Sequence, residues 1–286
     1  SSSIFEWIIK GKKMNDNKKI KGLFLGFVLL SNILFAQQPY YDDVNLDLTG
    51  LALKRELSQK IIDTHTKLLT YKEIWKVIQK TDLDPENSEL VLLLYGYNDS
   101  DEVLRTDRSR NKNKKGGRVG EWNREHTYPK SLATPKMSTD KPGAGTDAHH
   151  LRAADQKMNN DRASKKFTSG SGNARVIEFN FYPGDEWKGD VARMMMYMYL
   201  RYPNQCPPNG VGEGFPVEND SLMITLFLEW NAQDKVTQYE VNRNKYLEKK
   251  QGNRNPFIDN PYLATLIWGG ITAQDNWNME SIEEEE

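Results

Sequence analysis

Two neighbouring stretches, EWNREHTYPKSL (residues 121–132) and DAHHLRAADQKMNNDR (residues 147–162), hold most of the candidate chemistry of this chain. The 286-residue chain has only four histidines, and His126, His149 and His150 all lie in these stretches. Around them stand acids, amides and arginines, which are groups that bind metal ions and phosphates. This concentration of rare side chains indicates a functional site.

The residue types suit the hydrolysis of a phosphodiester. A histidine with an ordinary pKa of about 6.5 can take a proton from water near neutral pH. Glu125 and Asn159 carry oxygen ligands of the kind that hold Mg²⁺ or Ca²⁺, and such an ion can stabilise the scissile phosphate and the leaving oxygen. In an extended segment Glu125 and His126 point to opposite sides, so one could face the metal and the other the attacking water.

Each of these residues also has a non-catalytic interpretation. His126 could be a structural histidine, and Glu125 could be a surface acid. Asn159 could cap a helix while Asn160 acts as the ligand. The paired histidines of the second stretch are more often hydrogen-bonding scaffold than ligands.

Hydrophobic periodicity predicts an α+β domain that is mostly helical. The hydrophobic content of 37%, with seven Trp, thirteen Tyr and ten Phe, is sufficient for a real core. The expected helices are 51–69, 70–82, one that ends near Arg162, 189–203, and two or three within 221–268. The expected strands are 90–96 and 175–183, and the expected irregular segments include 105–120 and a turn at 255–261.

The first 36 residues have the features of a secretory signal peptide. Met14, the expected start, opens a basic segment that is followed by the apolar run LFLGFVLLSNILF (23–35) and by Ala36. A charged region, an apolar region of this length and a small residue at the cut point are typical of such signals. The run is shorter than the about 20 residues of a spanning helix, so no stable membrane anchor is expected. We therefore predict an exported protein, either secreted or periplasmic.

Charge is distributed unevenly along the chain. Without residues 1–36 it has 33 Lys and Arg against 38 Asp and Glu, a net charge of −5, which argues against a globally basic nucleic-acid binder. Between Arg105 and Lys136, however, ten basic residues stand against three acids. Such a block is either a footprint for a polyanion or a solvated loop. The residues predicted to contact nucleic acid are Arg110, Lys112, Lys114, Lys115, Arg118 and Arg124.

Cys206 is the only cysteine of the chain. A single cysteine allows no intrachain disulfide, and it also excludes a metal site built from several thiolates. The loops must therefore be held by packing.

The two quoted stretches resemble the endonuclease I family, bacterial secreted or periplasmic nucleases with a ββα-metal (His-Me finger) active site. Three more segments resemble that family, and together they extend the resemblance over most of residues 50–268: KGDVARMMMYM (188–198), QGNRNPFIDNP (251–261) and THTKLLTYKEIW (64–75). The resemblance implies a mostly helical α+β domain, residues 37–286, built around a ββα-metal core. We expect residues 275–286 to form a flexible tail.

The resemblance also implies a role for each matching residue. The implied catalytic residues are His126 as general base and Arg162 as a phosphate or structural contact, the implied metal ligands are Glu125 and Asn159, and the implied supporting residues are Asp147, His149 and His150. The family segment D-x-H-N-L has an asparagine where this chain has His150, so the role of that position stays open.

These features predict a secreted, metal-dependent, sequence-nonspecific endonuclease that acts on DNA, with RNA also chemically permitted. The expected cofactor is Mg²⁺, with Ca²⁺ or Mn²⁺ as alternatives, and the resemblance implies products with 5′-phosphates. A monomer is expected. Two other functions remain open: a non-catalytic polyanion-binding protein, and a metal-dependent phosphodiesterase that acts on small molecules.

Overall fold

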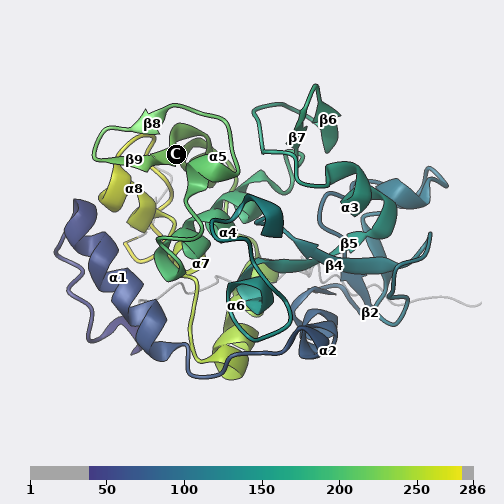
Figure 1. Ribbon diagram of the computed structural model, residues 1–286, viewed down its shortest axis with the longest axis horizontal. Coiled ribbons are helices and arrows are strands. Elements are labelled where there is room, and N and C mark those ends of the chain that lie inside the picture. Colours follow the sequence, from purple (N-terminus) through teal and green to yellow (C-terminus); the bar gives the residue numbers. More distant parts are fainter. Residues whose placement is uncertain (1–38, 279–286) are drawn as a thin grey trace, which may run out of the picture. The chain divides into compact units, whose positions relative to one another are not determined.

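The computed structural model describes residues 39–278 (Figure 1). The predicted signal peptide lies outside these residues, as do positions 279–286 of the expected tail. Within the described part, helices alternate with short antiparallel strands, which makes the protein α+β, as predicted.

The helices are α1 (Gly50–Thr64), α2 (Tyr71–Thr81), α3 (Gln156–Arg162), α4 (Lys188–Arg201), α5 (Thr225–Gln233), α6 (Gln238–Gln251), α7 (Pro256–Asp259) and α8 (Tyr262–Trp268). The strands are β1 (Leu83–Asp84), β2 (Asn87–Leu92), β3 (Ser109–Asn111), β4 (Trp122–His126), β5 (Leu151–Asp155), β6 (Arg175–Ile177), β7 (Asn180–Tyr182), β8 (Pro216–Val217) and β9 (Asp220–Ile224). Strands β1, β2 and β3 form one sheet, and the others pair as β4–β5, β6–β7 and β8–β9.

Strands β4 and β5 and helix α3 lie together in the structure, although residues 127–150 separate β4 from β5 in the sequence (Figure 1). The strands are antiparallel, with Glu125 opposite Arg152 and His126 opposite Leu151. Strand β5 runs directly into α3, because Asp155 ends the strand and caps the helix by accepting from the backbone N–H groups of the next turn. This junction fixes α3 beside the end of β4, where the candidate residues lie.

The core has two apolar clusters. The larger surrounds α4, where twelve of the fourteen residues are buried. The methionine stripe of this helix therefore packs in the core, as expected for a helix enclosed by the protein. The smaller lies between α2 and the β4–β5 pair and contains Ile74, Ile78, Trp122 and Leu151. It holds α2 against the strands that carry the candidate site.

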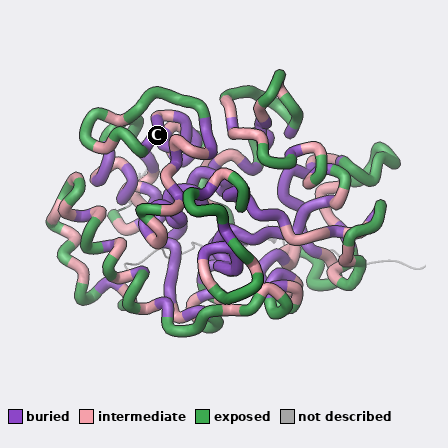
Figure 2. Tube along the Cα trace, viewed as in Figure 1, coloured by how far each residue is buried: buried purple, intermediate pink, exposed green. Residues whose placement is uncertain are grey.

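Strand β5 is buried along its whole length (Figure 2), although it contains a charged side chain. Arg152 donates to Asp82 at 3.2 Å and to Asp190 of α4 at 2.8 Å, and Arg243 of α6 also pairs with Asp82. Buried charges are tolerated only when they are paired and hydrogen-bonded in this way. The network fastens β5 to α4 and α6.

Several boundaries differ from the predicted ones. The helix predicted over 51–69 ends at Thr64, and the region read as a helix before Arg162 begins with strand β5. The strand predicted at 175–183 is a hairpin, because Glu178 has a positive φ of 53° and reverses the chain. The expected turn at 255–261 contains α7, whose first turn is capped by the Asn255 side chain.

Candidate active site

A cleft of about 300 Å³ lies at the end of β4, between the segment that follows this strand and helix α3. The four residues predicted as catalytic or metal-binding line it together: Glu125, His126, Asn159 and Arg162. They come from two parts of the chain that are 33 positions apart, and the β4–β5–α3 unit brings them together. The predicted base, the predicted metal ligands and the predicted arginine therefore share one cavity.

His126 is held by a main-chain oxygen. Its Nε2 lies 2.8 Å from the carbonyl oxygen of Gly145, and because a carbonyl only accepts, Nε2 carries the proton. Burial, followed by the nearby charge of His150, lowers the pKa of His126 well below its ordinary value. The ring is neutral near pH 7, and Nδ1 is left as its proton acceptor.

Glu125 is a buried acid, 3% exposed, and not a surface one. Its Oε1 accepts from the Tyr95 hydroxyl at 2.9 Å and lies 3.2 Å from Arg162. Burial raises the pKa of Glu125, and the charge of Arg162 partly offsets this. Both of these side-chain contacts fall on Oε1, and Glu125 lines the cleft.

Arg162 is 1% exposed, and its guanidinium donors point at the protein. They donate to the carbonyl oxygens of His126 at 3.1 Å and Thr127 at 2.9 Å, and the charge lies beside Glu125. The guanidinium also lies 4.6 Å from the ring centroid of Phe167. Of the two roles implied for Arg162, this geometry favours the structural contact, because it fixes the end of β4.

Asn159 lies on α3, half-exposed, and within residues 39–278 its side-chain amide makes no hydrogen bond. Asn160 is exposed and does not line the cleft, so the geometry favours Asn159 as the ligand. The same described residues contain no group of three or more His, Cys, Asp or Glu that could hold a metal ion. One carboxylate and one amide oxygen fit Mg²⁺, which keeps several waters and binds few protein ligands.

The predicted supporting residues lie behind the cleft and do not line it. Asp147 accepts from the hydroxyls of Tyr197 at 2.8 Å and Tyr202 at 3.1 Å and from the backbone N–H of His149. His150 contacts the carbonyl oxygen of Ala144 at 2.8 Å through Nε2. Together these bonds hold the loop that presents the acceptor oxygen of Gly145 to the base.

The basic residues predicted to contact nucleic acid do not form one exposed surface. Arg110 is 6% exposed and donates to Asp155 at 2.7 Å, to Asp107 at 2.8 Å and to two backbone carbonyls. It braces the β5–α3 junction, and we exclude it from the predicted nucleic-acid contacts. Lys112 is bound to Glu89 and to a carbonyl on β2, while Lys114 and Arg118 are exposed.

Arg124 lines the cleft and is held between aromatic rings. Its guanidinium lies 3.5 Å from the ring centroid of Tyr71 and 4.1 Å from that of Trp75, and it donates to the Tyr71 carbonyl at 2.5 Å. Stacking of this kind fixes the side chain while leaving it charged. Arg124 is half-buried and contributes to the wall of the cleft.

Two residues of the cleft region were not among the predicted site residues. Lys130 is exposed, lines the cleft and has no ion-pair partner among residues 39–278. It belongs to the basic block between Arg105 and Lys136, but it was not among the residues predicted to contact nucleic acid. Tyr95 follows an apolar run, and its contact with Glu125 depends on the tertiary fold.

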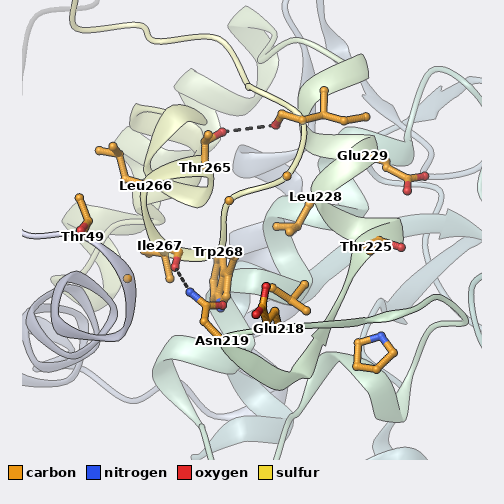
Figure 3. A pocket seen from close by; sticks show the side chains of 16 residues that line it. Thr49, Glu218, Asn219, Thr225, Leu228, Glu229, Thr265, Leu266, Ile267 and Trp268 are labelled. Carbon is orange, nitrogen blue, oxygen red and sulfur yellow. Dashed lines mark hydrogen bonds between the residues drawn. The ribbon is translucent and has the colours of Figure 1, made fainter.

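A larger hollow, about 920 Å³, lies elsewhere, between the start of α1, the β8–β9 turn, α5 and α8. Figure 3 shows its lining, with Leu228 and Trp268 in the wall and Asn219 donating to the carbonyl of Ile267. The residues predicted to be functional do not line it. Separately, among the described residues no helix combines the length and apolarity needed to cross a bilayer.

Comparisons with known proteins place the chain in a family. The endonuclease I family model matches residues 49–262. The chain is 42% identical over 238 residues to an extracellular ribonuclease of Bacillus subtilis (strain 168), which covers 77% of this chain and 75% of that protein. It is 27% identical over 124 residues to a periplasmic deoxyribonuclease of Aeromonas hydrophila, 40% of this chain and 47% of that protein. The chain is therefore a member of the endonuclease I family of nucleases.

Proposed function

We propose that this protein is an exported, metal-dependent endonuclease that hydrolyses phosphodiester bonds of RNA and DNA without sequence specificity, as a monomer. The observation that carries the proposal is the single cleft lined by Glu125, His126, Asn159 and Arg162. Strands β4 and β5 followed by α3 support a ββα-metal core. Relatives named as extracellular and periplasmic nucleases support export.

Both nucleic acids are included for a chemical reason. When water is the nucleophile, cleavage needs no 2′-hydroxyl, so DNA and RNA can react at the same site. The relatives matched over about three quarters of their length are named ribonucleases, whereas the deoxyribonuclease matches over a shorter segment. This pattern supports RNA as a substrate alongside DNA.

Each side chain has a proposed task. Glu125 and Asn159 would hold Mg²⁺, or Ca²⁺ or Mn²⁺, and such an ion would supply positive charge to stabilise the scissile phosphate. His126 takes a proton from water at Nδ1, because its Nε2 proton is committed to Gly145. Arg162 keeps Glu125 and the end of β4 in place, and Lys130 and Arg124 meet the phosphates of the strand.

The proposal is tested with three substrates of the wild-type protein: supercoiled plasmid, RNA, and RNA whose 2′-hydroxyls are methylated. With Mg²⁺ all three should be cut to products with 5′-phosphates, and EDTA should stop the reaction. Cutting that requires a free 2′-hydroxyl and leaves 2′,3′-cyclic phosphates would overturn the water mechanism. Binding without cutting would favour the polyanion-binding alternative, and cutting of small diesters alone would favour the small-molecule phosphodiesterase.

Asn159→Ala should raise the Mg²⁺ concentration needed for half-maximal activity. Loss of a residue that merely supports a metal ligand costs about 10–100-fold in affinity, so loss of a ligand should cost at least tenfold. Asn160→Ala is the matched control, since its side chain is exposed outside the cleft. If the two variants titrate alike, Asn159 is not a metal ligand.

A further inference from the structure

Three separate segments meet beside Arg124, on the side where α2 lies against β4. The rings of Tyr71 and Trp75, one turn apart on α2, hold the guanidinium of Arg124. Tyr71 also lies beside the base, with its ring centroid 5.5 Å from that of His126. Helix α2 therefore starts at the cleft and leads away from it.

Lys115 reaches the same place from the basic segment. Its backbone bridges to Trp122 at the start of β4, and the ring of Trp122 lies 5.3 Å from that of Trp75. The side chain of Gln79, farther along α2, donates to the Lys112 carbonyl at 3.0 Å and so fastens the segment to the helix. Burial lowers the pKa of Lys115, and the charge of Lys76 lowers it further. This agrees with the ammonium groups of Lys76 and Lys115 being neighbours.

Within residues 39–278, Lys76, Lys115 and Arg124 have no ion-pair partner. Glu121, which lies against Gly116, accepts from the backbone N–H of Arg118 instead. The acid one turn before Lys76 is Glu73, whose carboxylate accepts from the backbone and hydroxyl of Thr70 in the capping box of α2. Like charges held together without a counter-charge are unfavourable in the free protein, and a polyanion relieves them.

We propose that one strand of the substrate leaves the cleft over Arg124 and runs along α2, with its backbone phosphates on Lys76 and Lys115. The inference rests on the proposed nuclease function and adds the path of the substrate. Lysines on flexible stems meet phosphates as point charges and read no bases. This path suits an enzyme without sequence specificity. It replaces the buried Arg110 and the paired Lys112 as the extended contact surface.

The test compares Lys76→Glu/Lys115→Glu with Lys235→Glu/Lys249→Glu, which makes the same charge change at exposed lysines of the α5–α6 loop and of α6. Binding of a fluorescent single strand is measured in EDTA, so that no cutting occurs, over a range of salt. Each phosphate contact contributes about −0.7 to the slope of log K against log salt for single strands. The first variant should flatten the slope by about 1.4, and the control should leave it unchanged.

Kinetics with Mg²⁺ complete the test. The Lys76→Glu/Lys115→Glu variant should raise KM for a long strand by about tenfold, while hydrolysis of bis(p-nitrophenyl) phosphate, too small to reach α2, stays at the wild-type rate. Equal binding slopes for variant and control would overturn the path, and so would an equal loss on both substrates. A wild-type protein that cuts nothing would instead overturn the proposed function, and the binding slopes would still decide the path.

Discussion

Replacing His126 with alanine should lower kcat on plasmid and RNA by about 10²–10⁴-fold, the usual loss when a general base is removed. The proton on Nε2 is committed to Gly145, so Nδ1 is the nitrogen that can accept from water. The side chain makes no phosphate contact in the proposal, so binding of a labelled strand in EDTA should match that of the wild-type protein.

Two further measurements separate a base from a structural histidine. The variant leaves the Gly145 carbonyl without its donor, so the free energy of unfolding should fall by about 1–3 kcal/mol. Imidazole added to the buffer can enter the space left beside the cleft and should restore part of kcat. A variant that keeps a third of the wild-type rate, or one that folds and binds but does not respond to imidazole, would point to a different base.

Arg162→Met should lower the free energy of unfolding by about 3–5 kcal/mol, measured by urea denaturation. The substitution leaves the buried Glu125 without its counter-charge and the carbonyls of His126 and Thr127 without donors. Because Glu125 and His126 both depend on this arginine for their position, kcat should fall as well.

The chain offers a matched control, an arginine outside α3 that pairs with a residue of this same helix. Arg105 is exposed and pairs with Asp161 of α3 at 3.1 Å, and an exposed pair of this kind contributes about 0–1 kcal/mol. Arg105→Met should therefore change stability little. Adding Glu125→Gln to Arg162→Met removes the unpaired charge and should recover part of the lost stability. If Arg162→Met costs no more than Arg105→Met, the buried arginine does not hold the site.

Local sequence signals predicted the elements whose structure depends mainly on neighbouring residues. The apolar spacing of α2 and its Thr70–Glu73 capping box mark that helix, and its observed range differs from the prediction by one residue at each end. The stretch around His126 and the helix that ends at Arg162 were also recognisable, and the fold brings them into one cleft. Their catalytic roles stay predictions.

Local sequence signals did not predict the burial of residues whose partners lie far away in the sequence. The sequence of strand β5 does not alternate between polar and apolar residues, so it does not have the pattern of a half-buried strand. The strand can be buried because Asp82 and Asp190, from other parts of the chain, neutralise Arg152. Arg110 belongs to a basic segment that looks solvent-exposed in the sequence. It is buried because it pairs with Asp155, which lies 45 positions later. A charge count along the sequence cannot distinguish such an arginine from Arg118, which is exposed.

The acceptor that orients His126 is the backbone oxygen of Gly145, and no point mutation can delete a backbone oxygen. The tautomer of the base is therefore insensitive to side-chain chemistry at position 145, but it is sensitive to the shape of the loop. A Cβ added at Gly145 would lie 2.2 Å from the carbonyl oxygen of Ser138, so even alanine must displace the main chain there. In a mutational scan, this position should tolerate no replacement, although its residue contributes no functional group.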